Sequence, residues 1–247
     1  MPPTAVVKVG STSTTLLLAE RLDSPLRRAQ ELVDLFSEDG IARITAMAQE
    51  WSAYLGSLGV RVLAAGGEAT RTNPALERQL QQFFPNWWHL TGTMEGRLAW
   101  LAVKSRHPAA ELVIDIGGGS TEIISSRIAW TFPVGATRFD AKTINWPPLD
   151  HFAPPVVIGG TAVTLAQWAA CLQLDRLTVK RMHEQLTYSP EKFQNMEPMR
   201  RKILPTGLAL LDSVLAHGRW NQFQVSPRGL TEGLWIAASL GRGGSNL

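Results

Sequence analysis

The stretch from Val113 to Glu122 constrains this chain most, because a buried strand, a glycine turn and two carboxylates meet within it. An apolar run ends at Asp115, passes through Gly117-Gly118-Gly119-Ser120-Thr121-Glu122, and continues into a second apolar run. The pattern predicts a strand, a tight turn and a returning strand. Glycines let a backbone approach an anion closely, and successive N–H groups in such a turn suit phosphate. A plain glycine hairpin is the alternative. It is disfavoured because Asp115 can hold a cation or water and Glu122 points toward the ligand of the turn.

A weaker copy of this pattern lies near the N-terminus, where an apolar strand leads into Gly10-Ser11-Thr12-Ser13 and a second apolar strand. When the two stretches are aligned, Lys8 falls on Asp115, Gly10 on Gly117 and Ser13 on Ser120. We therefore expect two phosphate-binding hairpins, separated by about half the chain, and a duplicated fold.

A third glycine turn, Gly159-Gly160-Thr161, follows the apolar run Val156-Val157-Ile158 and directly precedes an expected helix over residues 162–172. The N-terminus of a helix offers amide donors to phosphate or nucleotide. A glycine-rich connection between a strand and a helix, without a ligand, is an equally good interpretation of this segment alone.

Strand-like and helix-like segments alternate along the rest of the chain. Helical spacing marks residues 41–55, the segment from Pro74, the segment from Gly92 to about His107, residues 203–215 and a last helix from about Pro227; strand patterns mark residues 60–64, 129–134 and 223–226. This succession predicts an α/β architecture with ligand sites at strand ends.

Composition excludes several classes of protein. The 247 residues are 45% hydrophobic, and their net charge of +3 includes no block of like charge of the kind that forms a nucleic-acid-binding arm. The single Cys171, expected in a core helix, excludes an internal disulfide and metal sites built from cysteines. No basic leader and no window of about 20 apolar residues is present, so we expect a soluble cytoplasmic protein that binds neither membrane nor nucleic acid.

Five blocks, in order, resemble the Ppx/GppA family of exopolyphosphatases and guanosine pentaphosphate phosphohydrolases, within the actin, sugar kinase and heat-shock ATPase superfamily. The segment from Asp115 to Glu122 is similar to the family's second phosphate loop, and Thr91–Leu98 to its Ser-Gly-x-x-Glu-Ala-Arg-Leu segment. The other blocks are residues 132–136, 158–161 and 226–233.

The resemblance implies two actin-like (ribonuclease H-like) domains with an interdomain cleft. We expect them at residues 1–109 and 110–247, with the option that the last helix packs back on the first domain. The resemblance further implies Mg²⁺-assisted release of terminal orthophosphate from inorganic polyphosphate or pppGpp. Glu95 then falls on the base that activates water, Glu122 joins it in catalysis, and Asp115 and Glu122 hold the metal. Phosphate binding is expected at the three glycine turns and at Arg71, and a homodimer is possible.

Departures from the family pattern keep an alternative open. The family's first loop begins with aspartate where this chain has Lys8, and Thr93 and Met94 replace acidic groups beside Glu95. An ammonium repels a metal ion but can itself neutralise phosphate. The alternative is therefore a weak or inactive protein that binds polyphosphate or (p)ppGpp. An ATP-dependent kinase or actin-like ATPase is a third, less favoured class.

Overall fold

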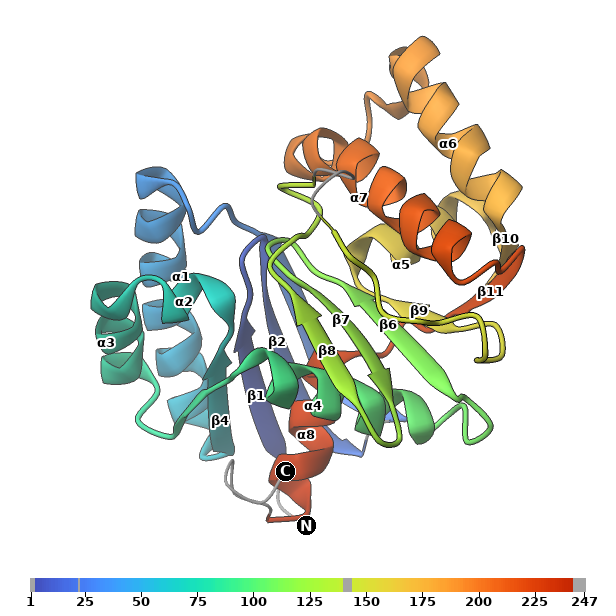
Figure 1. Ribbon diagram of the computed structural model, residues 1–247. Coiled ribbons are helices and arrows are strands. Elements are labelled where there is room, and N and C mark those ends of the chain that lie inside the picture. Colours follow the sequence, from blue (N-terminus) through green and yellow to red (C-terminus); the bar gives the residue numbers. More distant parts are fainter. Residues whose placement is uncertain (1–2, 22, 140–143, 242–247) are drawn as a thin grey trace. The chain divides into compact units, whose positions relative to one another are not determined.

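The computed structural model describes residues 3–21, 23–139 and 144–241, which divide into two compact units (Figure 1). Unit 1 combines Met1–Ala102 with Leu230–Leu247, and unit 2 is the continuous segment Val103–Gly229. The division falls inside helix α4 (Gly92–Lys104), before the boundary expected between residues 109 and 110, and the last helix belongs to unit 1.

Unit 1 contains a five-stranded mixed sheet in the order β3-β2-β1-β4-β5. Its strands are β1 (Thr4–Val9), β2 (Ser13–Arg21), β3 (Ser24–Leu32), β4 (Arg61–Gly66) and β5 (Trp87–His89). The first three form an antiparallel meander, whereas β4 runs parallel to β1 and β5 parallel to β4. Strand β1 is buried on both faces of this sheet, which explains its nearly continuous apolar sequence.

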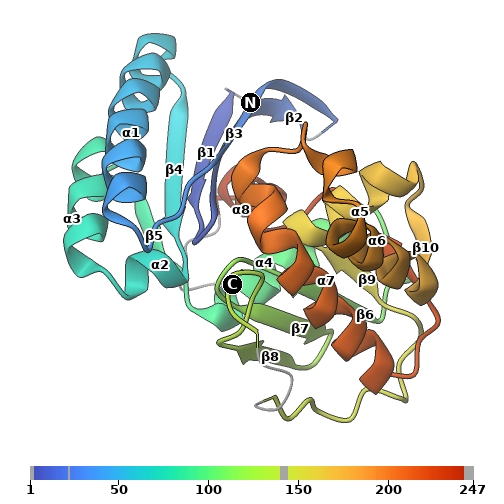
Figure 2. The same cartoon turned by 90° about the horizontal axis from the view of Figure 1, so that it is seen from above.

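The helices of unit 1 cover both faces of its sheet. Helices α1 (Glu38–Leu58), α2 (Glu68–Arg71) and α3 (Pro74–Phe83) pack with the β1 side chains of Ala5, Val7 and Val9. Figure 2 shows α1 and α3 together on one side of the unit 1 sheet. Helices α4 and α8 (Leu230–Ser239) pack with Val6 on the other face. Local signals set the helix ends. Ser37 caps the start of α1, and Gly59, at a φ of 62°, ends it.

Helix α8 is fixed to unit 1 by close polar contacts. The indole N–H of Trp235 donates to the carbonyls of Thr4 (3.1 Å) and Ala19 (3.3 Å), and Glu232 forms an ion pair with Arg28 of β3. Gly233 lies against the backbone carbonyl of Leu98 in α4, where any Cβ would collide. Only glycine lets the two helices approach so closely.

Unit 2 contains a six-stranded sheet in the order β10-β11-β9-β6-β7-β8. Its strands are β6 (Leu112–Ile116), β7 (Thr121–Ser125), β8 (Ala129–Phe132), β9 (Val156–Ile158), β10 (Gln173–Asp175) and β11 (Gln222–Val225). Strands β6, β7 and β8 form an antiparallel meander, and β9 runs parallel to both β6 and β11.

One face of this sheet carries the core of unit 2. The helices that supply it are α5 (Gly160–Ala169), α6 (Arg176–Tyr188) and α7 (Pro198–His217), and the 3-10 helix Pro190–Phe193 adds Phe193. Two tryptophans, Trp146 and Trp220, complete the cluster, and their indole N–H groups donate to Ser213 and to the carbonyl of Phe152. Buried indoles are thus satisfied as expected for core residues.

The strand orders show that the two units repeat one topology. The series β3-β2-β1-β4-β5 of unit 1 corresponds to β8-β7-β6-β9-β11 of unit 2, with the same parallel and antiparallel pairings. Lys8 pairs with Thr15 and Ala65 as Asp115 pairs with Glu122 and Ile158. The sequence-based expectation of a duplicated fold is therefore met in the sheet register.

One residue was placed wrongly from the sequence. Cys171 is exposed and lies beyond the end of α5, because Ala170 adopts the left-handed conformation with a φ of 50° and stops the helix.

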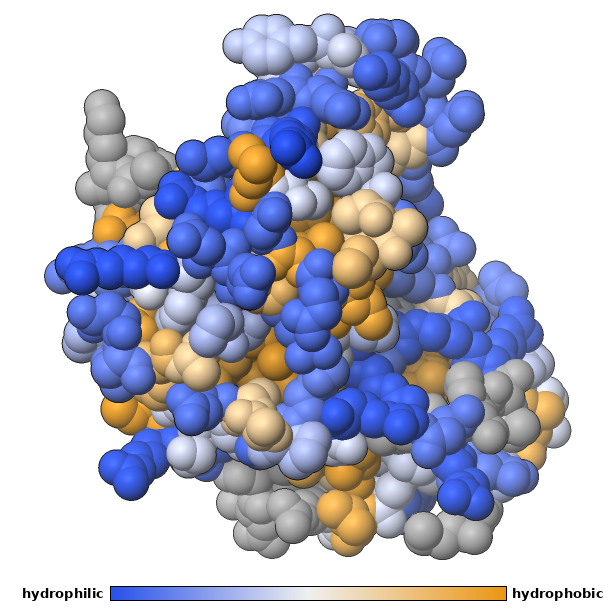
Figure 3. All heavy atoms as spheres, turned by 90° about the vertical axis from the view of Figure 1, so that its right-hand side faces the viewer, coloured by the Kyte–Doolittle hydropathy of each residue, from blue (hydrophilic) through white to orange (hydrophobic). Residues whose placement is uncertain are grey.

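Polar residues cover most of the face in Figure 3, interrupted by apolar ones. None of the helices in the described part of the chain combines the length and apolar character that crossing a membrane requires.

Candidate functional site

The first glycine turn, Gly10–Ser13, is a tight hairpin whose carbonyls are occupied. The N–H of Gly10 donates to the carbonyl of Ser13 (2.9 Å), and the carbonyls of Ser11 and Thr12 accept from Leu35 (3.1 Å) and Val33 (3.1 Å). The N–H groups of Ser11 and Thr12 donate to no acceptor among residues 3–21, 23–139 and 144–241. A buried backbone with occupied carbonyls and unused amides is suited to an anion.

Lys8, at the end of β1, folds back over this turn. Its Nζ lies 2.6 Å from the position that a Cβ of Gly10 would occupy, so the ammonium takes the space that the glycine leaves open. Lys8 is only partly buried, whereas its neighbours in β1 are buried. Lys8 therefore places a positive charge at the first turn, at the strand position that corresponds to Asp115 in unit 2.

Glu95, the candidate base, lies in the first turn of α4 and is buried. Thr91 caps this helix by accepting from the N–H of Met94 (3.2 Å), and Nη1 of Arg71 donates to Oε1 of Glu95 at 2.7 Å. Burial raises the pKa of the Glu95 carboxyl above its ordinary value, while Arg71, and more weakly Lys8, act to lower that pKa. The carboxyl thus has the raised proton affinity that a general base requires.

Arg71 and Gly67 fix the position of this carboxyl. Arg71 also donates to the carbonyl of Leu90, just before α4, so its guanidinium links α2 to the start of α4. A Cβ on Gly67 would lie 2.7 Å from Oε1 of Glu95, which means that the carboxylate rests directly on the strand-to-helix turn after β4. The described contacts of Arg71 orient Glu95, and its expected role in phosphate binding stays a prediction.

The second turn, Gly117-Gly118-Gly119-Ser120, has the same closure as the first. The N–H of Gly117 donates to the carbonyl of Ser120 (3.0 Å). The carbonyls of Gly117 and Gly118 accept from the N–H groups of Ala136 (2.9 Å) and Thr137 (2.9 Å). Within the part of the chain that the structure describes, the amides of Gly118 and Gly119 have no protein acceptor.

The segment from Gly135 to Arg138 donates hydrogen bonds to the carbonyls of the second turn. This contact was not predicted from the sequence. A Cβ on Gly135 would lie 2.5 Å from the carbonyl oxygen of Gly118, so only glycine permits this approach. The hydroxyl of Thr137 also donates to Gly118 (2.8 Å), and Arg138 donates to the carbonyl of Gly119 (3.4 Å).

Asp115 and Glu122 are directly opposite each other on β6 and β7, so their side chains project from the same face of the sheet. Glu122 is buried. Like charges directly opposite each other on neighbouring strands are destabilising. Mg²⁺ is commonly bound by one or two carboxylates together with phosphate oxygens, so this donor pair fits the ion. Among the described residues no set of three His, Cys, Asp or Glu could hold a metal without such added oxygens.

The third turn, Gly159-Gly160-Thr161, starts α5 and adjoins Asp115. Gly159 has a φ of 94°, and a Cβ there would lie 2.9 Å from Oδ1 of Asp115. Thr161 is buried, and within residues 3–21, 23–139 and 144–241 its hydroxyl has no hydrogen-bond partner. The carboxylate of Asp115 and the N-terminus of α5 therefore lie side by side.

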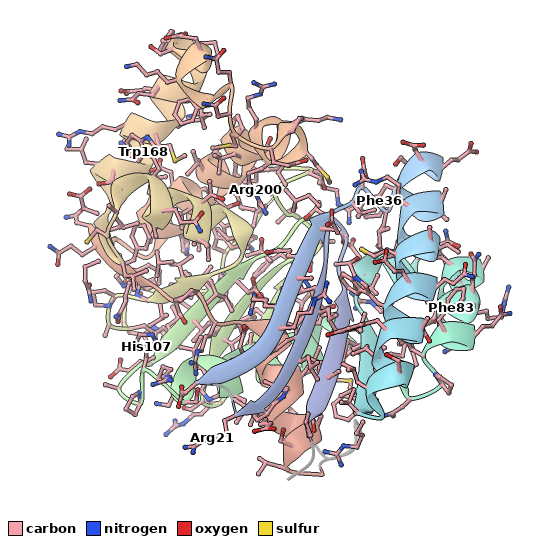
Figure 4. The ribbon with its side chains drawn as sticks, turned by 180° about the vertical axis from the view of Figure 1, so that it is seen from behind. Arg21, Phe36, Phe83, His107, Trp168 and Arg200 are labelled. Carbon is pink, nitrogen blue, oxygen red and sulfur yellow. The ribbon has the colours of Figure 1, made fainter. Side chains whose placement is uncertain are left out.

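Arg200, labelled in Figure 4, is a functional candidate that the sequence interpretation missed. It lies in the first turn of α7, and its Nη2 is 2.6 Å from the position of a Cβ on Gly160. Burial lowers the pKa of its guanidinium. A cation in the first turn of a helix opposes the helix dipole, and this anomaly was the available signal.

The structure thus forms two groups of predicted residues. Unit 1 brings together Gly10–Ser13, Arg71 and Glu95, and unit 2 brings together Asp115, the second turn, Glu122 and the third turn.

Comparisons with known proteins give matches among solved structures. No protein-family model matches the chain, and no curated protein does. The Ppx/GppA enzyme of Aquifex aeolicus is 22% identical with a TM-score of 0.76, covering 96% of this chain and 99% of its own. An exopolyphosphatase from Cytophaga hutchinsonii is 21% identical with a TM-score of 0.81, covering 98% and 99%. An exopolyphosphatase-like protein is 16% identical with a TM-score of 0.82, covering 96% and 97%.

These likenesses show that the chain has the fold of Ppx/GppA proteins over nearly its whole length. The resemblance read from the sequence blocks is confirmed at the level of the fold, as is the prediction of an α/β protein with two actin-like domains.

Proposed function

We propose that this protein is a phosphoanhydride hydrolase that releases terminal orthophosphate from inorganic polyphosphate or from pppGpp. The observation that carries the proposal is the buried Glu95 carboxyl, whose pKa is raised by burial and whose position is fixed by Arg71 and Gly67. A buried carboxyl held in one orientation is suited to taking a proton from a water molecule. The fold shared with solved exopolyphosphatases supports the same reaction class.

In the proposed reaction, Glu95 removes a proton from a water molecule whose oxygen forms a bond to the terminal phosphorus. The bond between that phosphorus and the bridging oxygen breaks, and the shortened chain leaves with the bridging oxygen. The amides of the glycine turns bind the equatorial oxygens, on which negative charge accumulates. Arg200 offers a cation beside the third turn, within unit 2.

Asp115 and Glu122 are the residues that would hold Mg²⁺. The ion, when bound, would neutralise phosphate oxygens and stabilise the leaving group. The role of this chain is then to present two adjacent carboxylates from β6 and β7 next to the amides of the second turn. Holding these groups in place before the reaction avoids the cost of ordering them during it.

A binding protein with weak or no turnover is the second candidate function, favoured by one observation. Lys8 takes the position at the first turn that aspartate has in the family the chain resembles, and its ammonium lies over Gly10. Such a turn keeps its affinity for phosphate even if the first unit contributes no metal contact.

Orthophosphate release from polyphosphate and from pppGpp, measured with Mg²⁺ and with EDTA, tests the proposal. Glu95→Gln keeps the shape of the side chain and removes the base, so we expect release to fall at least about a hundredfold. Glu50→Gln, which changes an exposed carboxylate on α1, serves as the matched control and should leave release unchanged. Binding of both substrates without release by the native protein would favour the second candidate.

A further inference from the structure

The Lys8 ammonium occupies a position that sequence alone does not specify. Lys8 faces the same side of the unit 1 sheet as Val6, the side on which α4 and α8 pack and from which Glu95 comes. Its Nζ lies over Gly10, in the space left by the missing Cβ. The charge of Lys8 also acts on the Glu95 carboxyl, so both groups face one region of unit 1.

This ammonium has no protein partner in the described ranges 3–21, 23–139 and 144–241, where it forms neither an ion pair nor a hydrogen bond. Glu95, the carboxylate on which its charge acts, is already paired with Arg71 at 2.7 Å. A partly buried ammonium without a partner therefore lies beside two buried amides, those of Ser11 and Thr12, that also have no protein acceptor. The turn thus combines two unused amide donors with a positive charge over its first glycine, which is complementary to a phosphate group.

A divalent metal ion does not fit the same turn. The end of β1 carries the ammonium of Lys8 and not a carboxylate. A divalent metal ion bound at this turn would be repelled by that ammonium. The carboxylate pair that does fit a metal, Asp115 with Glu122, belongs to unit 2. Neutralisation of phosphate charge at the first turn thus has to come from the chain itself.

We infer that Lys8 is the cation of the first glycine turn, and that this turn binds a terminal phosphate of a polyphosphate chain without a divalent metal ion. The inference rests on the proposed function for its ligand, because the same geometry would bind any accessible phosphate group. It assigns to Lys8 a direct contact with substrate and separates metal-independent binding in unit 1 from metal-dependent chemistry in unit 2.

Binding of inorganic tripolyphosphate, measured by calorimetry in EDTA, tests this inference without requiring turnover. We expect the native chain to bind, and Lys8→Met to bind roughly ten- to hundredfold more weakly, as for loss of one charged hydrogen-bonding group. Lys8→Arg, which keeps the charge, should recover most of the affinity. Lys192→Met removes the same charge from an exposed position of unit 2 and should change nothing.

Two results would overturn the inference. One is equal affinity of the native chain and Lys8→Met in EDTA, with circular dichroism showing both folded. The other is native binding that appears only when Mg²⁺ is added. Neither result depends on hydrolysis, because a native chain that binds tripolyphosphate in EDTA but never releases orthophosphate would refute the proposed function and leave the role of Lys8 intact.

Discussion

The first and second glycine turns have the same backbone hydrogen bond, but the side chains beside them carry opposite charges. In each, the N–H of the first glycine closes the turn on the carbonyl of a serine three residues later, at 2.9 Å in Gly10–Ser13 and 3.0 Å in Gly117–Ser120. The strand residue two positions before the first glycine is Lys8 in unit 1 and Asp115 in unit 2. The two turns therefore share one hydrogen-bonding pattern, with two amides that donate to no acceptor in the described part of the chain, whereas the charged side chain beside each turn differs in sign.

The glycine turns after β4 in unit 1 and after β9 in unit 2 also carry side chains of opposite charge. In unit 1 the carboxylate of Glu95 rests on Gly67, and in unit 2 the guanidinium of Arg200 rests on Gly160. With Lys8 and Arg71 near Glu95, unit 1 gathers two cations and one carboxylate. Unit 2 gathers the reverse, two carboxylates (Asp115 and Glu122) and one cation (Arg200). We interpret the reversal as a division of tasks, with the base in unit 1 and the metal ligands in unit 2.

The largest effect is expected when the second turn carries a lysine, as the first turn does. Asp115→Lys replaces a carboxylate of the metal pair by an ammonium, so Mg²⁺-dependent orthophosphate release should fall about a thousandfold. Binding of Mn²⁺, measured by electron paramagnetic resonance, should weaken in parallel. Unchanged release with an unchanged metal requirement would show that the two turns do not differ in the proposed manner.

The reverse change makes the first turn resemble the second. Lys8→Asp removes the built-in cation and adds a carboxylate, so tripolyphosphate affinity in EDTA should fall by roughly ten- to hundredfold or more. Added Mg²⁺ should restore much of that affinity, because the new carboxylate can bind the ion. If affinity in EDTA stays at the native value, charge at this turn is irrelevant to binding.

A smaller effect is expected from adding one methyl group at the other turns. Gly67→Ala would displace the Glu95 carboxylate, and Gly160→Ala the Arg200 guanidinium, in each case the mobile end of a side chain. We expect several-fold losses, in release for the first and in tripolyphosphate affinity for the second, with little change in melting temperature. Gly56→Ala in α1 meets no atom within 4 Å and is the matched control.

The last prediction concerns the pH dependence of orthophosphate release, which Arg71→Met should change. Glu95 acts as a base only when deprotonated, so release falls as the pH drops through the raised pKa of this carboxyl. Removing Arg71 removes the main influence that lowers that pKa, so the acid limb of the pH–rate profile should move to higher pH by about one unit. Arg176→Met breaks a comparable ion pair with Asp212 in unit 2 and should not move the limb.

Much of this arrangement was predictable because its signals are local. Glycine runs after apolar strands indicated all three turns, and the repeated pattern around Lys8 and Asp115 indicated the duplication. Pro74 after Asn73 marked the start of α3, since asparagine caps a helix and proline fits its first turn.

The remaining features depend on contacts between distant residues. Arg200 reaches Gly160 only because α7 packs beside α5, and nothing near position 200 in the sequence specifies that neighbour. The end of α5 at Ala170 had no glycine to mark it, so Cys171 was expected inside the helix. The bent conformation of Lys8 follows from space at Gly10, which is a property of the folded turn.

The return of α8 to unit 1 has a consequence for synthesis on the ribosome. The N-terminal sheet leaves the ribosome with one apolar face, which includes Val6, Leu17 and Leu63 and which, in the described part of the chain, the helices α4 and α8 cover. Since all of Val103–Gly229 is made before α8, this face waits on the order of ten seconds for its cover. The segment translated in the middle is continuous, so all of its core residues have been made before α8 is.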